Sequence, residues 1–141
     1  MMAKFTFINH ASYVIETDQS VLLVDPWVEG YAFNEGWSLL DTSTTNEDLV
    51  NYISAIKKEK FIWLSHEHSD HFSVPFLMKL KKKAERVTFL FQKTLDGRVA
   101  DFIRKLGFNV IESNDSSEVI DSELSVVTFP FQCGVSYCLT I

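Results

Sequence analysis

Four side chains that can bind a metal ion stand close together in the middle of the chain. They follow Phe61–Leu64, an apolar run short enough for a buried strand, in the pattern H-x-H-x-D-H: His66, His68, Asp70 and His71. Residues two apart in an extended segment point the same way, so the first two histidines can reach one ion. A bend toward a helix would turn Asp70 and His71 toward a second ion. Imidazole and carboxylate ligands hold a catalytic metal and leave positions open for water, so we predict a metal site here.

This stretch resembles the signature of the metallo-β-lactamase superfamily. Ser65–Ser73 (S-H-E-H-S-D-H-F-S) and Asp25–Leu40 (D-P-W-V-E-G-Y-A-F-N-E-G-W-S-L-L) together are similar to the metallo-β-lactamase-like part of the CMP-N-acetylneuraminate hydroxylases. Asn9–Ser12 (N-H-A-S) is similar to the G-H-A-S of a branch that includes L-ascorbate-6-phosphate lactonases and N-acyl-phosphatidylethanolamine phospholipases. The resemblance runs from about Phe5 to about Phe91 and implies the fold more specifically than the substrate.

Four further residues are candidates for orienting the metal ligands or for lining a substrate pocket. His10 falls at the junction of two predicted strands, where it is either a substrate hydrogen-bond donor near the metal or an ordinary turn residue. Asp25, before Pro26, either orients a ligand histidine or starts a turn. Trp27 and Trp37 lie in a long connection and either wall a substrate pocket or cover the core.

The other strands of the chain are predicted from runs of β-branched and aromatic residues. We predict strands at Phe5–Asn9, Ser12–Glu16, Val21–Val24 and Val87–Phe91, and later strands at Phe108–Ile111, Glu118–Ile120, Leu124–Phe131 and Val135–Ile141. The connection from Trp27 to Thr45 shows no regular pattern.

Three helices are predicted between the strands. Thr44 and Glu47 have the spacing of a capping box, and Ser73 is a plausible N-cap for a second helix. Apolar residues spaced from Leu95 to Leu106 predict a third amphipathic helix, which Gly107 ends.

Strands first, then helices and strands in alternation, predict a single α/β domain with a mixed sheet over residues 1–141. The family resemblance implies a metallo-β-lactamase-like αββα layered fold, mostly its N-terminal half. No histidine follows His71, so the family's later ligands, a third histidine, a bridging aspartate and a last histidine, would have to come later. Gln132 and Ser136 stand near two of those positions. We therefore expect a domain truncated at its C-terminus, with a decayed copy as the alternative.

Composition limits the partners and the compartment. The chain of 141 residues has 46% hydrophobic residues and a net charge of −6, which favours a small-molecule substrate over nucleic acid. Cys133 and Cys138, five residues apart on one extended segment, would point to opposite faces, which suits a reducing compartment. Since we find neither an apolar signal core nor a membrane-spanning run, we expect no membrane contact and a cytoplasmic protein.

We predict a metal-dependent hydrolase that uses metal-activated water on an ester, amide or phosphoester bond. One or two zinc ions are expected, with iron or manganese as alternatives, and Asp70 as both ligand and proton handler. A second hypothesis, from the resemblance, is an iron-dependent oxygenase component served by an iron–sulfur protein. A third is a non-catalytic half-domain that needs a homodimer partner or the missing half. We expect the chain alone to be a weak catalyst, because the third ligand would have to be Gln132, Cys133 or a carboxylate elsewhere.

Overall fold

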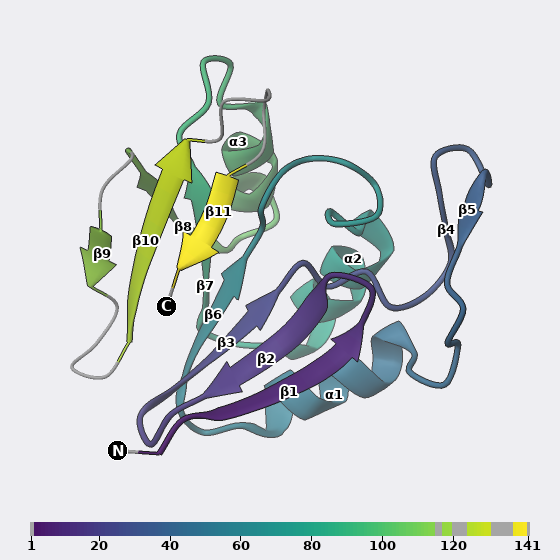
Figure 1. The fold of residues 1–141 in the computed structure, drawn as a ribbon, viewed down its shortest axis with the longest axis horizontal. Helices are drawn as coiled ribbons and strands as arrows, with labels where there is room; N and C mark the ends of the chain where they lie inside the picture. The colour runs from purple at the N-terminus through teal and green to yellow at the C-terminus, as the bar shows by residue number, and fades with distance from the viewer. Residues whose placement is uncertain (1, 115–116, 120–123, 131–136, 141) are drawn as a thin grey trace.

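A six-stranded sheet forms the centre of the computed structural model, which describes residues 2–114, 117–119, 124–130 and 137–140. Its strands are β1 (Lys4–Asn9), β2 (Ser12–Glu16), β3 (Ser20–Val24), β6 (Glu59–Trp63), β7 (Val87–Gln92) and β8 (Asn109–Ser113), in the order β1-β2-β3-β6-β7-β8. The first three strands pair antiparallel, and β3, β6, β7 and β8 pair parallel (Figure 1). The predicted mixed sheet is confirmed.

Helices make the connections between the parallel strands. These are α1 (Asn46–Ala55), α2 (Val74–Lys83) and α3 (Arg98–Lys105). Alternate residues of each strand face opposite sides, so Leu23 and Ile62 pack toward the helices, whereas Leu22 and Trp63 belong to the core of the other face. Because both faces of the sheet are buried at residues 21–24 of β3 and 61–63 of β6, these stretches read as continuous apolar runs.

A second sheet packs on the face away from the helices. It consists of β9 (Ser117–Val119), β10 (Ser125–Pro130) and β11 (Tyr137–Thr140), with β10 in the middle of an antiparallel set. Leu124 and Val126 bury their side chains against Trp63 and Leu90 of the first sheet. The order is therefore helices, sheet, sheet, which agrees with the predicted α/β layered class.

The predicted helix starts are correct in one case and shifted in two. Ser73 caps α2, and its side chain accepts a hydrogen bond from the backbone N–H of Phe76. The cap of α1 is Thr45 with Asp48, one residue later than the predicted Thr44 and Glu47, because the Glu47 carboxylate instead lies 2.6 Å from Lys83 Nζ of α2.

The predicted third helix begins too early. Leu95 is fully exposed, and α3 starts after Gly97, whose φ of 62° places it in the left-handed region. The Leu95–Val99 spacing matches a helical repeat, but the turn around Gly97 interrupts the helix between them. Gly107, with φ of 97°, ends α3 as predicted.

The connection between β3 and α1 contains a short hairpin, which the sequence did not predict. Its strands are β4 (Tyr31–Ala32) and β5 (Trp37–Ser38). Phe33, Asn34 and Glu35 at its tip all have positive φ, a conformation that non-glycine residues seldom adopt. Side-chain alternation is invisible in strands of two residues, so no periodicity could reveal them.

Replacing Thr45 by alanine is expected to lower the free energy of unfolding by about 1 kcal/mol. The variant loses the acceptor for the Asp48 N–H, which lies 3.1 Å from Thr45 Oγ1. Thr44→Ala is the matched control and is expected to change stability by less than about 0.5 kcal/mol. Urea unfolding of both variants checks this, and a larger loss in Thr44→Ala would assign the cap to the wrong threonine.

Candidate metal centre

The candidate metal centre lies at the carboxyl ends of two neighbouring parallel strands. Asp25 follows β3 and Ser65 follows β6, so the parallel pairing brings the two residues together. The Asp25 N–H donates to Trp63 O at 3.0 Å, and the φ of Asp25 is 40°. This positive φ turns the chain at the strand end. A turn then forms at His68, whose carbonyl accepts from the N–H groups of His71 and Phe72.

Asp25 holds the start of the segment between β6 and α2, residues 64–73, through three hydrogen bonds; this segment is called the metal-binding loop below. Its Oδ1 accepts from the Ser65 N–H at 2.7 Å, and its Oδ2 accepts from Ser65 Oγ at 2.6 Å and from His71 Nδ1 at 2.7 Å. The residue is 3% exposed, so these bonds are shielded from water. Of the two interpretations of Asp25, its placement favours the one that orients a histidine.

The same network assigns the ring tautomers. Because Ser65 Oγ gives its proton to Asp25, it accepts from His66 Nδ1, which lies 2.8 Å away. His71 Nδ1 donates to Asp25, so in the neutral forms of both rings Nε2 carries a lone pair. A lone pair on the outward nitrogen is what a metal ligand requires.

Two overlapping groups of donors share Asp70. One group is His66, His68 and Asp70, and the other is His10, Asp70 and His71; the donor atoms of each group lie within 4.8 Å of one another. The sequence predicted the pair His66 and His68 and the pair Asp70 and His71. It did not predict that Asp70 would also approach the first pair.

The donor distances fit a metal ion. His66 Nε2 lies 3.0 Å from His68 Nδ1, and Asp70 Oδ2 lies 3.0 Å from His10 Nε2 and 3.3 Å from His71 Nε2. Zinc bonds of about 2.0–2.2 Å place neighbouring ligands about 2.9–3.5 Å apart in octahedral or tetrahedral geometry. Asp70 Oδ1 is buried without a hydrogen-bond partner, although Asp70 is 5% exposed. A cation would satisfy this oxygen, so the residues fit a metal.

The two half-buried histidine rings, His66 and His71, have pKa values shifted in opposite directions. Burial lowers the pKa of His66, helped by the neighbouring charges of His71 and His68. Burial also opposes the charged form of His71, but the hydrogen bond to Asp25 and the charges of Asp25 and Asp70 outweigh it and raise the pKa of that ring. Metal binding at His71 must therefore displace a proton, so affinity rises with pH.

The metal-free chain is expected to lose stability as the pH rises through the raised pKa of His71. The folded chain then binds more protons than the unfolded chain, so the free energy of unfolding falls with pH. This contribution is fully present below the ordinary value of 6.5 and is lost above the raised pKa. Urea unfolding over this window, compared with His71→Gln, checks it, since the lowered pKa of His66 acts in the opposite direction in both chains. Equal pH slopes for the two chains would contradict the assignment.

Aromatic side chains border the centre on the side of the β4–β5 hairpin. The ring of His10 lies 5.2 Å from that of Trp27, which is buried, and 6.4 Å from that of Trp37, which is half exposed. Phe33 lies 5.8 Å from His68 and 5.1 Å from Trp37. Trp27 therefore belongs to the interior behind His10, whereas Trp37 and Phe33 lie at the rim of the centre.

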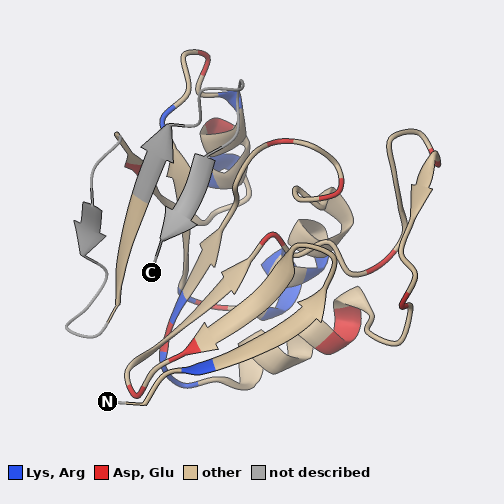
Figure 2. Cartoon of the chain, in the orientation of Figure 1, with Lys and Arg blue, Asp and Glu red and all other residues tan. Residues whose placement is uncertain are grey.

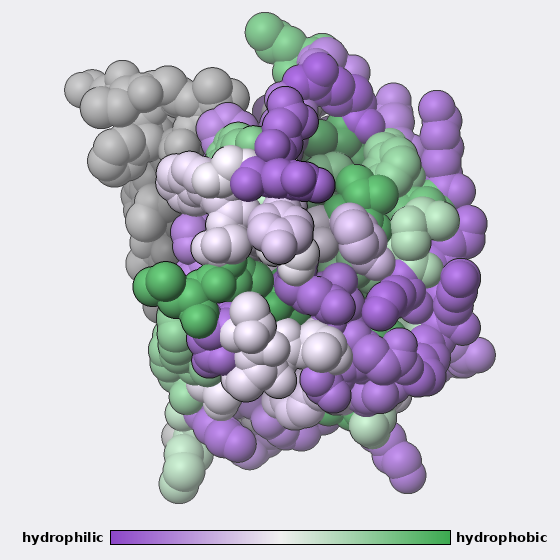
Figure 3. Space-filling model, turned by 90° about the vertical axis from the view of Figure 1, so that its right-hand side faces the viewer, coloured by the Kyte–Doolittle hydropathy of each residue, from purple (hydrophilic) through white to green (hydrophobic). Residues whose placement is uncertain are grey.

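The hairpin is connected to the metal-binding loop directly. The backbone N–H of Phe33 donates to Ser69 Oγ at 2.9 Å. Viewed from the side that bears β4 and β5, hydrophilic and hydrophobic residues are interspersed over the surface rather than gathered in one apolar area (Figure 3). Acidic residues mark the loop after β6, and lysines lie along α2 (Figure 2).

Sequence reasoning missed the roles of Ser65 and Ser69. Ser65 was part of the quoted motif, and its position directly after a buried strand was the only signal of its contact with Asp25. The ion pair between Arg98 and Glu67, which connects the start of α3 to the metal-binding loop, had no signal in the sequence. Gln132, Cys133 and Ser136, named as candidates for the missing ligands, lie outside the described residues.

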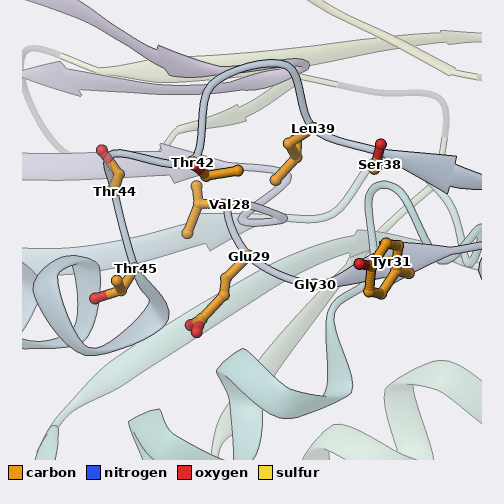
Figure 4. A pocket seen from close by; sticks show the side chains of 9 residues that line it. All are labelled: Val28, Glu29, Gly30, Tyr31, Ser38, Leu39, Thr42, Thr44 and Thr45. Carbon is orange, nitrogen blue, oxygen red and sulfur yellow. The ribbon is translucent and has the colours of Figure 1, made fainter.

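A pocket lies away from the metal centre. It has a volume of about 270 Å³ and lies between β4, β5 and the start of α1 (Figure 4). It is lined by Val28, Glu29, Gly30, Tyr31, Ser38, Leu39, Thr42, Thr44 and Thr45. The Glu29 carboxylate accepts from the Asn46 N–H at 2.8 Å and so helps to fix the start of α1. None of the metal-binding candidates lines this pocket.

Comparison with known proteins identifies the family. The family model described as "Beta-lactamase superfamily domain" matches residues 4–132, so the chain belongs to this family. The predicted resemblance to the metallo-β-lactamase superfamily is confirmed. Among the described residues no helix has the length and apolar character needed to cross a membrane.

The similar proteins include two hydroxylases and a hydrolase. Cytidine monophosphate-N-acetylneuraminic acid hydroxylase of Danio rerio is 30% identical over 109 residues, which are 77% of this chain and 17% of that protein. The chain thus spans about a sixth of this relative. The metallo hydrolase Igni18 of Ignicoccus hospitalis has a similar fold, with a TM-score of 0.62 at 22% identity over 96% of this chain and 53% of its own. CmlA, a diiron β-hydroxylase from Streptomyces venezuelae, has a TM-score of 0.63 at 23% identity over 92% of this chain and 24% of its own.

Proposed function

We propose that this chain carries the metal-binding part of an enzyme that hydrolyses an ester, amide or phosphoester bond of a small molecule. The observation that carries the proposal is the position of Asp70, which belongs to both donor groups and keeps a buried oxygen without a partner. When bound, zinc would lower the pKa of a coordinated water and polarise the bond that is broken.

The residues of the chain supply the geometry and the proton transfer. Asp25 holds His71 through Nδ1, and Ser65 holds His66 through Nδ1, so both rings direct Nε2 toward the centre. Asp70 would also take up a proton of the attacking water and return it to the leaving group, while its Oδ2 faces His71 Nε2.

The rim of the centre suits a substrate with an apolar or planar part. Phe33 and Trp37 present partly exposed rings beside His68 and His10, and these rings are held in a T-shaped contact with each other. Aromatic rings bind planar groups and sugar faces through stacking and apolar contact. We infer that the part of the substrate beyond the reacting bond lies against this hairpin.

Hydroxylation is a second candidate, which the 30% identity to the Danio rerio hydroxylase favours. An imidazole and carboxylate set binds iron as well as zinc. Hydroxylation inserts one atom of O₂ into a C–H bond and reduces the other to water with two electrons and two protons. Such a reaction requires an electron donor, whereas hydrolysis requires only water.

The metal and the oxygen requirement distinguish the two reactions. The purified chain is loaded with zinc without air, or with iron(II) in air with a reductant, and assayed on generic lactone and phosphodiester substrates. We expect turnover with zinc in the absence of oxygen and no turnover in Asp70→Asn. Glu67→Gln, an exposed carboxylate in the same loop, is the control that keeps activity. Substrate oxidation that depends on iron and oxygen, with no zinc hydrolysis, would replace this proposal by the second candidate.

A further inference from the structure

We propose that His10 is a third protein ligand of the ion held by Asp70 and His71. The inference rests on the proposed metal centre and assigns it a residue that lies 60 positions before Asp70 in the chain. It replaces the two interpretations of His10 that the sequence left open, a substrate donor or a turn residue. It also gives the ion at Asp70 and His71 a third protein ligand, which the sequence had led us to seek at Gln132, Cys133 or a carboxylate elsewhere.

Three donor atoms converge at this place. His10 Nε2 and His71 Nε2 lie 3.0 Å and 3.3 Å from the same oxygen, Asp70 Oδ2. These separations fall in the range of about 2.9–3.5 Å expected between neighbouring ligands of one ion. The rings of His10 and His71 are 5.6 Å apart and inclined at 61°, so their edges, not their faces, meet at the carboxylate.

The backbone holds His10 in an unusual conformation. Its φ is 47°, and the pairing of β1 with β2 shifts register between Phe7 and Asn9, directly before it. Asn9 is 7% exposed, and its side chain donates to Asp41 O at 2.7 Å, which fixes the chain at this turn. Non-glycine residues with positive φ are concentrated at functional sites, where the surrounding structure maintains the strain.

The surroundings also fix the ring of His10. Trp27 meets it in a T-shaped contact from the interior, with an interplanar angle of 88°. Trp37 meets it from the rim at 83°. A ring held between two indoles can keep Nε2 directed at Asp70, as a ligand must. Because Asp70 Oδ1 remains without a partner, the same carboxylate can also serve the group of His66 and His68.

Three ligands complete the usual protein contribution to a catalytic zinc site. Such sites take three protein ligands and leave a fourth position for water. His10, Asp70 and His71 meet that number within the described residues. The alternative is that His10 only donates a hydrogen bond to Asp70 and orients it, as residues around metal ligands commonly do.

A glutamine variant distinguishes a ligand from an orienting residue. His10→Gln keeps an amide N–H that can donate to Asp70, but a neutral amide is a poor zinc ligand. We expect wild type to bind two zinc ions per chain in competition with a chromophoric chelator. His10→Gln should bind the ion at Asp70 and His71 at least about a hundredfold more weakly than wild type does. Such a loss exceeds the tenfold to hundredfold cost of losing a residue that only orients a ligand. Binding of this ion within tenfold of wild type would overturn the inference.

A cysteine variant gives a spectroscopic test. His10→Cys, in a chain whose Cys133 and Cys138 are replaced by serine, is titrated with cobalt(II), which substitutes for zinc. We expect a thiolate-to-cobalt charge-transfer band that the same chain with His10 lacks. A folded variant, verified by circular dichroism, that binds cobalt without this band would contradict the inference. Should the variant fail to fold, the glutamine titration decides, and failure of wild type to bind any metal would overturn the proposed function as well.

Discussion

Replacing His66 or His68 by alanine is expected to abolish tight binding of one ion per chain. The two nitrogens that face each other at 3.0 Å are His66 Nε2 and His68 Nδ1, and each removal leaves the other without its chelating partner. We expect affinity for that ion to fall by more than about a hundredfold, since even an orienting residue contributes tenfold to a hundredfold. Metal content after exchange against a chelator measures the loss.

The same experiment separates the two donor groups. Each alanine variant should retain the ion held by Asp70 and His71, so zinc content should fall from two ions to one. Asp70→Ala should reduce the zinc bound at both donor groups, because Asp70 belongs to both. Glu67→Ala, which lies between the two histidines and pairs with Arg98, is the control and should bind as wild type does. Unchanged zinc content in His66→Ala would rule out this ligand assignment.

Replacing Asp25 by asparagine is expected to weaken binding at His71 by about tenfold to a hundredfold with little change in shape. Oδ1 of the asparagine can still accept from the Ser65 N–H, but the amide nitrogen then faces His71 Nδ1. The ring would have to accept there and carry its proton on Nε2, the nitrogen that must bind the metal. The ion at His66 and His68 should be retained, and zinc titration followed by calorimetry measures both events.

A second variant separates the structural role of Asp25 from its effect on the histidine. Asp25→Ala leaves the buried Ser65 N–H without an acceptor and should cost about 2–3 kcal/mol of stability. Ser65→Ala keeps that N–H paired with Asp25 and removes only the hydroxyl, so its loss of stability should be smaller. Asp25→Asn that binds metal as wild type does would show that this carboxylate does not control the tautomer of His71.

The parts of the fold that could be predicted from the sequence are those with a clear pattern of apolar residues. The five-residue runs of β3 and β6 and the apolar stripe of α2 gave their positions within a residue or two. The cap of α1 was shifted because two adjacent threonines each have an acidic residue three positions later. Only the packing of α1 on α2, where Glu47 meets Lys83, selects between them.

The metal-binding residues were visible as a motif, but their grouping was not. The spacing of His66 and His68 predicted that they would face each other, because this depends only on local extended geometry. The approach of His10 to Asp70 depends on how β1 and β2 lie on the sheet, and the motif N-H-A-S gave only a hypothesis. Asp25 required both the parallel pairing of β3 with β6 and a positive φ, neither of which a single sequence displays.

The most direct test of the metal centre is a crystal structure of the zinc-loaded chain with anomalous data collected on both sides of the zinc edge. We predict two anomalous peaks. One should lie within bonding distance of His66 Nε2 and His68 Nδ1, and the other within bonding distance of Asp70 Oδ2 and the Nε2 atoms of His71 and His10. Zinc bound elsewhere in the chain, with no peak between these side chains, would contradict the account.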